Sequence, residues 1–179
     1  MTQYSVHYQN DSTMSGSVFL YLTVVNSGNP VLFPVVWQGK YVHPTTMGVF
    51  RWTYLYDFAW AETGKIEPGI FCDVCQIWEA DLQNSNQVTL TRIDQAFSFT
   101  NQTKVGEPGI LYMKQDDTIP ADKAAVGIGM DGRPVTVAQA QPCMTLAIKP
   151  ELQLWIGFGD FKEDQIIDPS TISTKATIT

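Results

Sequence analysis

Short runs in which apolar and polar residues alternate follow one another along the whole chain. Alternation with a period of two is typical of a half-buried β-strand, whereas an amphipathic helix needs a sustained period of 3.6 residues, which no segment shows. The runs predict strands at 1–9, 17–25, 32–37, 48–60, 70–78, 87–93, 95–100, 110–114, 124–130, 135–141, 144–148, 152–158 and 172–178. A single helical turn is expected at 120–123 or at 168–171.

The segment 48–60 has the clearest alternation. Every second position is aromatic: Phe50, Trp52, Tyr54, Tyr56 and Phe58. Because alternate side chains of a strand point to the same side, one strand over this segment would carry an entirely aromatic face. That face is expected to be either core or the floor of a binding cleft.

Turn residues separate the runs. The sequence Glu-Pro-Gly-Ile occurs at 67–70 and again at 107–110, and each copy is expected to form a turn that leads into a buried strand. Further turns are expected at 26–30, 38–40, 84–86 and 131–134, and a hairpin is expected around Asp94. Many short strands at this spacing predict an all-β, antiparallel β-sandwich, jelly-roll-like, with residues 1–179 in a single domain.

Composition agrees with a folded domain that has a neutral polar surface. Apolar residues make up 44% of the 179 residues, while charged residues make up only 16%, against roughly 25% in an ordinary domain. The net charge of −7 argues against nucleic-acid partners and against docking on anionic membranes. No apolar stretch is long enough for a membrane span. Residues 1–9 do not resemble a signal peptide, so a cytoplasmic location, or export without a classical signal peptide, is expected.

Cysteine and histidine are too few and too scattered to predict a metal site. Cys72 and Cys75 form a CxxC, Cys143 is distant, and the only histidines are His7 and His43. In a strand, positions i and i+3 point to opposite faces, so one metal ion would not be reached by both CxxC cysteines. We expect no metal, no cofactor and no disulfide framework, with the cysteines acting as small apolar residues.

Catalytic motifs are also missing. No GxSxG is present, and the glycines at 127, 129 and 132 lack the Lys-Ser/Thr of a phosphate loop. The remaining catalytic option is a pair of carboxylates beside an aromatic cleft, as in glycoside hydrolases. The candidates near the aromatic strands are Asp57, Glu62, Asp73, Glu79 and Asp81. The alternative is that these carboxylates serve turns and the surface.

Tryptophan is abundant, with five residues in the chain. Exposed aromatic rings stack on sugars while nearby polar side chains hydrogen-bond the hydroxyl groups, so a glycan-binding site is one hypothesis. Its predicted residues are Trp52, Asp57, Trp60, Glu62, Trp78 and Asp81. The alternative is that the tryptophans fill the core, as they usually do in sandwiches.

Several short strings, in order along nearly the whole chain, resemble the RhiA-type, rhizosphere-expressed bacterial protein family. They are Phe50-x-Trp52, Tyr56-x-Phe58-x-Trp60-x-Glu62-Thr63-Gly64, Gln76-x-Trp78-x-Ala80-Asp81, Asn86-x-Val88, Phe97-x-Phe99-Thr100-Asn101-Gln102-Thr103, Val126-Gly127-Ile128-Gly129-Met130, Gln139-Ala140-Gln141-Pro142, Trp155-Ile156-x-Phe158-Gly159, and Ile167-Asp168 with Ile172. The resemblance implies quorum-regulated expression in host-associated bacteria. It implies no particular reaction, and the cysteines are not part of it.

Two classes of function follow. The first, which we favour, is a non-enzymatic protein that binds a glycan or a host surface, or associates with copies of itself as a homo-oligomer. The second is a small glycoside-active or other hydrolytic enzyme that uses carboxylates beside an aromatic cleft. Replacing Asp57, Glu62 and Asp81 by alanine would distinguish them, because an enzyme would lose turnover while it stayed folded.

Overall fold

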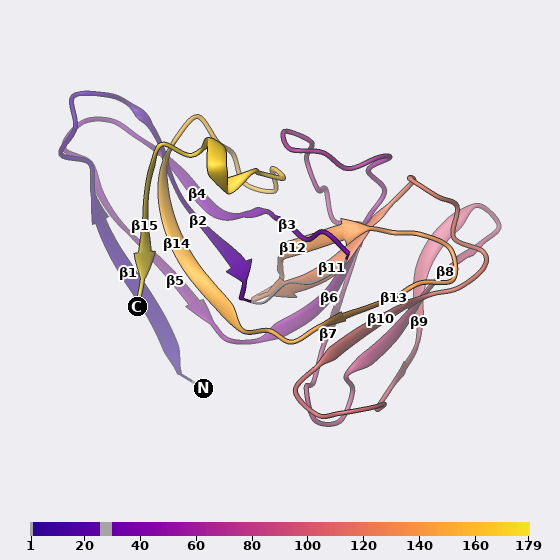
Figure 1. Ribbon diagram of the computed structural model, residues 1–179. Helices are drawn as coiled ribbons and strands as arrows, with labels where there is room; N and C mark the ends of the chain where they lie inside the picture. Colours follow the sequence, from indigo (N-terminus) through magenta and orange to yellow (C-terminus); the bar gives the residue numbers. More distant parts are fainter. Residues whose placement is uncertain (1, 26–29) are drawn as a thin grey trace.

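The computed structural model describes residues 2–25 and 30–179 as a set of packed β-sheets (Figure 1). Its helical content in these residues is one short 3-10 helix, η1 (Pro169–Thr171), which confirms the turn expected at 168–171. The predicted all-β, sandwich-like class is therefore confirmed. Within the described residues, no helix is long and apolar enough to cross a membrane. The turn expected at 26–30 lies almost entirely outside them.

One half of the molecule, here called the closed half, consists of two broad sheets. The five-stranded sheet has the order β3-β12-β11-β6-β7, and the four-stranded sheet has the order β13-β10-β8-β9. The strands of the first are β3 (Phe33–Pro34), β12 (Arg133–Gln139), β11 (Ala125–Met130), β6 (Tyr56–Ala61) and β7 (Gln76–Glu79). Those of the second are β13 (Thr145–Ile148), β10 (Leu111–Gln115), β8 (Gln87–Ile93) and β9 (Ala96–Thr103). All these pairs are antiparallel except β8 with β10, which is parallel.

A continuous apolar core fills the space between these two sheets. Phe58 and Ile128 come from the five-stranded sheet, and Leu90, Phe99 and Met113 come from the four-stranded sheet; each is at most 1% exposed. Alternating side chains of facing strands supply these layers, as the period of two predicts. Complete burial of such side chains is the main source of stability in this half.

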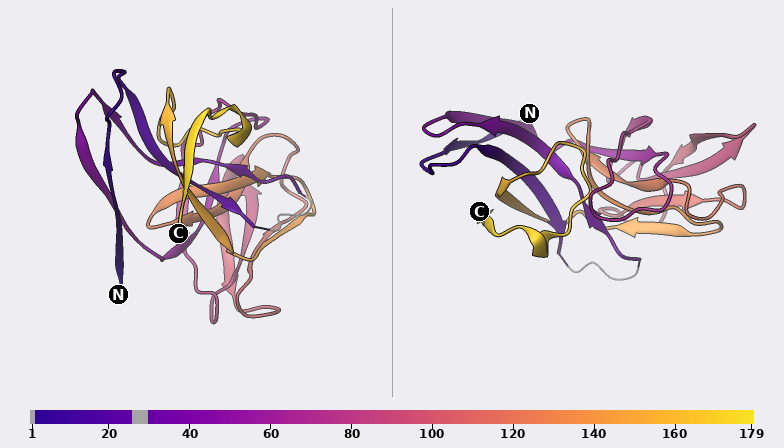
Figure 2. Two further views of the ribbon diagram at one scale, coloured as in Figure 1. Left: turned by 60° about the vertical axis from the view of Figure 1, so that its left-hand side comes forward. Right: turned by 90° about the horizontal axis from the view of Figure 1, so that it is seen from above.

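The other half, here called the open half, has unequal layers. A four-stranded sheet of order β15-β14-β2-β4 faces a sheet of only two strands, β1 and β5. Their bounds are β15 (Thr174–Ile178), β14 (Leu152–Gly159), β2 (Gly16–Val24), β4 (Val36–Val42), β1 (Gln3–Gln9) and β5 (Met47–Thr53). Figure 1 and Figure 2 place both chain termini in this half.

The core of the open half is less completely covered. Leu20, Trp37 and Phe50 are fully buried in it, but Val6 and Ile156 are only partly buried. On the outer face of the four-stranded sheet, residues that include Ile167 and Ile172 cover Phe19 and Tyr21. The inner face has the β1–β5 pair opposite it, and Met130 and Val135 from the closed half join the same core.

The expected single strand over 48–60 is wrong. It consists of two strands, β5 and β6, which belong to different sheets and pair with β1 and β11 respectively. The break is stabilised by hydrogen bonds from the Leu55 N–H to the Thr53 carbonyl (3.0 Å) and from the Asp131 N–H to the Leu55 carbonyl (2.8 Å). The aromatic face is therefore divided, with Phe50 and Trp52 in the open half and Phe58 in the closed half.

Two more element predictions are wrong. Residues 38–40 do not interrupt a strand, because β4 runs through them, and residues 70–78 form a strand only from Gln76 onward. The two Glu-Pro-Gly segments do form turns, in which Gly69 and Gly109 have positive φ values of 101° and 88°. Only the second leads directly into a strand, β10.

The hairpins joined by two-residue turns are where sequence reasoning succeeds best. Strands β8 and β9 join through Asp94 and Gln95, whose φ values are 49° and 67°. Strands β11 and β12 join through Asp131 and Gly132, with φ values of 55° and 76°. Positive φ at both central residues is the type I′ geometry that matches the twist of a hairpin.

Candidate functional site

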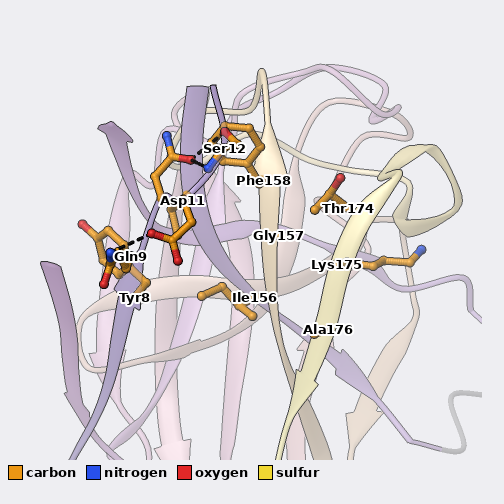
Figure 3. A pocket seen from close by; sticks show the side chains of 12 residues that line it. Tyr8, Gln9, Asp11, Ser12, Ile156, Gly157, Phe158, Thr174, Lys175 and Ala176 are labelled. Atoms are coloured by element: carbon orange, nitrogen blue, oxygen red, sulfur yellow. Dashed lines mark hydrogen bonds between the residues drawn. The ribbon is translucent and has the colours of Figure 1, made fainter. Parts of the chain in front are cut away.

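A groove opens between β1 and β15 in the open half, with β14 at its floor (Figure 3). We call it the β1–β15 groove. Its volume is about 340 Å³. It exists because two strands cannot cover the inner face of a four-stranded sheet.

The floor of the groove is apolar. Val18 from β2 and Ile156 and Phe158 from β14 face it, and all three belong to or pack against the core of the open half. Gly16 explains how Phe158 lies there, because a Cβ at position 16 would come within 2.9 Å of the Phe158 ring. The glycine therefore lets this ring lie flat against β2.

The wall beside β1 is held by the side chain of Asn10, which is 5% exposed. Its Nδ2 donates to the Met14 carbonyl (2.9 Å), and its Oδ1 accepts from the backbone N–H of Ser12 (3.1 Å). Its backbone N–H donates to the Thr46 carbonyl (2.9 Å). These bonds fix the turn that follows β1 against the turn before β5.

The opposite wall is β15, which contributes Thr174, Lys175 and Ala176. The Lys175 ammonium donates to the Pro169 carbonyl, and Figure 3 shows its side chain directed away from the groove. The only carboxylate on the lining is Asp11, which accepts a hydrogen bond from Gln9 (2.6 Å). The groove thus presents an apolar floor and a mostly neutral rim.

The groove lining holds no set of groups arranged for acid–base or nucleophilic catalysis. Burial raises the pKa of the Tyr8 phenol above its ordinary value, so this side chain is neutral and acts as a hydrogen-bonding aromatic surface. Such a surface is suited to binding an extended, largely apolar segment.

Three of the six predicted binding residues are buried. Trp52 is 4% exposed and lies between Tyr4 and Trp37 in the core of the open half. Trp60 is 7% exposed, and its Nε1 donates to the Gln76 side chain (2.8 Å). Asp57 is also 7% exposed.

The other three reach the surface to different degrees. Trp78 is half-buried against Phe99, and Glu62 is exposed just beyond the end of β6. Asp81 is exposed and accepts hydrogen bonds from the N–H groups of Gln83 (2.8 Å) and Asn84 (3.2 Å). These bonds hold the pKa of the Asp81 carboxyl below its usual value and assign the side chain to a turn.

The structure brings some of the predicted residues together and separates others. Trp60 and Trp78 lie on the neighbouring strands β6 and β7 and pack into the same core cluster. Asp57 and Glu62 lie about 16 Å apart along β6, if a strand advances about 3.3 Å per residue. The binding role of the six residues stays a prediction.

Asp57 has two acidic neighbours on other elements. Glu79 lies directly opposite it on β7, and Asp131 follows the end of β11. Burial raises the pKa of the Asp57 carboxyl, a hydrogen bond from the Gly132 N–H (2.8 Å) lowers it, and the charges of Glu79 and Asp131 raise it again. The overall pKa is raised.

The three cysteines lie in different environments. Cys72 is buried, and burial raises its pKa to about 12, so it stays a neutral thiol. Cys75 and Cys143 are exposed, and all three are free. Within residues 2–25 and 30–179, no three His, Cys, Asp or Glu side chains are placed to hold a metal ion.

A second pocket, of about 490 Å³, lies beside the β11–β12 hairpin and is lined by Asp73, Arg133, Glu163 and Asp164. Arg133 and Glu163 form an ion pair of 2.9 Å with both side chains largely exposed. Burial raises the pKa of Asp164. The residues that line this second pocket are far apart in the sequence.

Neither this pocket nor the β1–β15 groove was found from the sequence. The groove joins residues 8–12, 156–158 and 174–176, which no local pattern connects. One signal is that β1 alternates apolar and polar residues without any Asp, Glu, Lys or Arg, which is unusual for a strand at a sheet edge.

Comparison with known proteins gives one family. The profile of a family described as RhiA matches residues 1–179. The protein described as "Protein RhiA" from Rhizobium leguminosarum bv. viciae is 27% identical over 165 residues, which covers 88% of this chain and 68% of that protein. No solved structure matches the chain.

Proposed function

This chain belongs to the RhiA family, and we propose that it acts as a non-catalytic binding protein that associates with copies of itself. The observation that carries the proposal is the position of its exposed apolar side chains. Tyr4, Met14, Met47 and Tyr54 are between 42% and 72% exposed and lie on or beside the β1–β5 layer of the open half, and Tyr41, which is 67% exposed, lies on β4 of the facing sheet.

Single exposed apolar residues such as Phe71 and Ile93 are ordinary, but a group of them in the open half favours a contact surface there. The apolar floor of the β1–β15 groove adjoins the same layer. Because the strands there carry few charges, another surface can approach without removing charged groups from water, which is the expensive part of association.

The positions of the carboxylates Asp57, Glu62 and Asp81 support the non-catalytic assignment. Asp57 and Glu62 are too far apart to flank one glycosidic bond, which needs carboxyl groups about 5–9.5 Å apart. Asp81 is committed to a turn by its hydrogen bonds.

Sedimentation velocity over a wide range of protein concentration tests the proposal. We expect the weight-average sedimentation coefficient to rise with concentration in the micromolar range or to correspond to a dimer throughout. A chain that stays monomeric up to about 1 mM, where an association free energy would be weaker than about 4 kcal/mol, would overturn it.

Glycan binding is a second candidate, supported by one feature. Tyr41 is 67% exposed and meets the ring of His43 edge-on at 5.5 Å, with Ser15 bonded to His43 Nδ1 (2.8 Å). An exposed ring beside a fixed imidazole and a hydroxyl suits a sugar. Together with the six predicted residues, it can be tested on a glycan array, and Tyr41→Ala should remove any signal that depends on this ring.

The hydrolytic alternative rests on Asp57 and Glu79, which face each other across β6 and β7. Opposed side chains in such a pair have Cβ atoms about 4.5–5.5 Å apart, a separation compatible with a retaining glycosidase. Turnover of aryl glycosides that is lost in Asp57→Asn would favour this alternative.

Host association and quorum-regulated expression are proposed from the family resemblance. Transcript levels across culture phases test the proposed quorum regulation.

A further inference from the structure

The outer edge of β1 has no strand partner in the part of the chain that the structure describes. β1 pairs with β5 through all seven of its residues, in an unbroken register from Gln3 opposite Thr53 to Gln9 opposite Met47. Its other edge therefore presents backbone N–H and C=O groups with nothing from a neighbouring strand to satisfy them.

The edges of the closed half are protected. The edge strands β7 and β9 are linked, because the Gln76 side chain accepts from the Phe99 N–H (2.7 Å) and the Gln102 side chain donates to the Glu79 carbonyl (2.6 Å). The remaining edge strands there, β3 and β13, have only two and four residues. Short or covered edges do not template pairing with another chain.

The two edges of the larger sheet in the open half are protected as well. Along β4, the Asp164 N–H donates to the Val36 carbonyl (2.9 Å), and the Gly39 N–H donates to the Glu163 carboxylate (2.9 Å). The β15 edge has five residues and carries Lys175 at its second position. A lysine on an edge strand discourages addition of another strand.

β1 has none of these protective features. Its sequence contains no Asp, Glu, Lys, Arg, Pro or Gly, and its pairing with β5 has no bulge. Tyr4, Val6 and Tyr8 form its inner face, and Gln3, Ser5, His7 and Gln9 form its outer face. In a chain of net charge −7, this strand without carboxylates is a place where two copies can meet without acidic side chains facing each other.

We propose that β1 pairs antiparallel with β1 of a second copy, giving a continuous four-stranded sheet β5–β1–β1–β5 across a two-fold axis. This inference rests on the proposed self-association and specifies its interface. A two-fold axis makes the contact isologous, so each strand meets an identical one. Only a register centred on Val6 pairs all seven residues of both strands.

The Val6-centred register is self-complementary. It sets Tyr4 of each copy opposite Tyr8 of the other, and Ser5 opposite His7. Tyr8 lines the β1–β15 groove, so the residue beside it on the open edge is directed over the groove floor. Tyr4 stacks on Trp52 of its own chain and is 42% exposed, so the exposed edge of its ring meets Tyr8 at the rim of the second copy's groove. The two β1 strands thereby cover both grooves.

The test compares two double variants by sedimentation velocity. In Ser5→Lys/His7→Lys, each new lysine faces a lysine of the other copy, while both positions are exposed in a single chain. The matched control, Ser173→Lys/Thr177→Lys, adds the same charge at exposed positions around the β15 edge. We expect the first variant to weaken self-association by about tenfold or more and the control to change it less than about threefold. Circular dichroism and urea unfolding confirm that both variants are folded.

The possible outcomes distinguish failure of the proposed β1 interface from failure of the proposed self-association. If the unmodified chain associates and both variants associate equally well, the β1 interface is wrong while self-association stands. If the unmodified chain is monomeric at every concentration, both proposals fail. A positive test of register is Val6→Cys in a Cys75→Ser/Cys143→Ser background. It should give a disulfide-linked dimer under mild oxidation, and Val49→Cys, on the neighbouring strand β5, should give none.

Discussion

The closed half and the open half are built from the same kind of strand but differ in how completely their layers match. In the closed half, five strands face four, and side chains such as Leu90 and Ile128 are wholly excluded from water. In the open half, four strands face two, and Ile156 and Phe158 remain partly uncovered beside a groove. The closed half therefore buries its apolar side chains completely, whereas the open half retains apolar surface, which is the surface proposed to contact a second copy.

The largest effect is expected where two strands of the closed half touch most closely. A Cβ at Gly127 would lie 2.0 Å from the Thr136 carbonyl oxygen and 2.7 Å from the Val137 Cα. Because these are backbone atoms of the paired strand, Gly127→Val should cost about 4 kcal/mol or more and abolish cooperative folding. Urea denaturation followed by tryptophan fluorescence measures it. The control is Gly39→Ala, where the nearest contact is an ordinary 3.4 Å, and a comparable loss there would contradict the interpretation.

A second large effect is expected at Asn86, which is 1% exposed. Its Nδ2 lies within hydrogen-bond distance of the carbonyls of Val105, Glu107 and Ile110, and its Oδ1 accepts from the Val105 N–H. Asn86→Ala leaves these backbone groups unpaired and should lower the free energy of unfolding by about 3 kcal/mol. Asn84→Ala, at an exposed site nearby, should cost less than about 1 kcal/mol. Equal losses in the two variants would show that Asn86 is not the support of this turn.

Truncations in the two cores compare the halves directly. Leu90→Ala in the closed half should cost about 3 kcal/mol, because it removes a fully buried side chain. Ile156→Ala, on the groove floor, should cost only about 1 kcal/mol, since water already reaches it, but it should weaken self-association. Urea unfolding measures the free energy of unfolding of each variant, and sedimentation velocity measures its self-association. If Ile156→Ala were as destabilising as Leu90→Ala and left association unchanged, the proposed difference in role between the closed half and the open half would be contradicted.

The smallest effect concerns the pH dependence at Asp57. Its pKa is raised in the folded chain, so its contribution to stability is complete below the unfolded pKa, about 3.9, and is lost as the pH rises through the folded pKa. Asp57→Asn keeps an acceptor for Gly132 and removes the repulsion from Glu79 and Asp131. The variant should gain up to about 1 kcal/mol relative to the unmodified chain at pH 7, and this gain should vanish near pH 3. Measuring the difference between the two proteins cancels the titration of all other carboxyls. A difference independent of pH would contradict the assignment.

Prediction from the sequence succeeded where the determinants are local. The Asp94 and Asp131 hairpins follow from turn residues that tolerate positive φ, and the neighbouring strands follow from alternation. It failed at 48–60, where one alternating pattern spans two strands in different sheets. Alternation continues through the break, because each strand buries its aromatic side chains in a different core.

The candidate site could be predicted only in part. The expectation that the tryptophans serve either core or cleft was reasonable, since composition does not specify which rings lie inside; Trp37, Trp52 and Trp60 are buried. The opposition of Asp57 and Glu79 depends on the register of β6 with β7, which the intervening loop does not encode in any simple pattern.

By itself, the sequence determined that this protein is an all-β sandwich with short turns, because alternation and turn geometry are properties of neighbouring residues. Only the tertiary structure decided that one half is closed and the other open. The number of strands in each layer depends on which distant segments pair, so no single segment indicates the groove between β1 and β15, and the composition of β1 indicates an open edge only once its pairing is known.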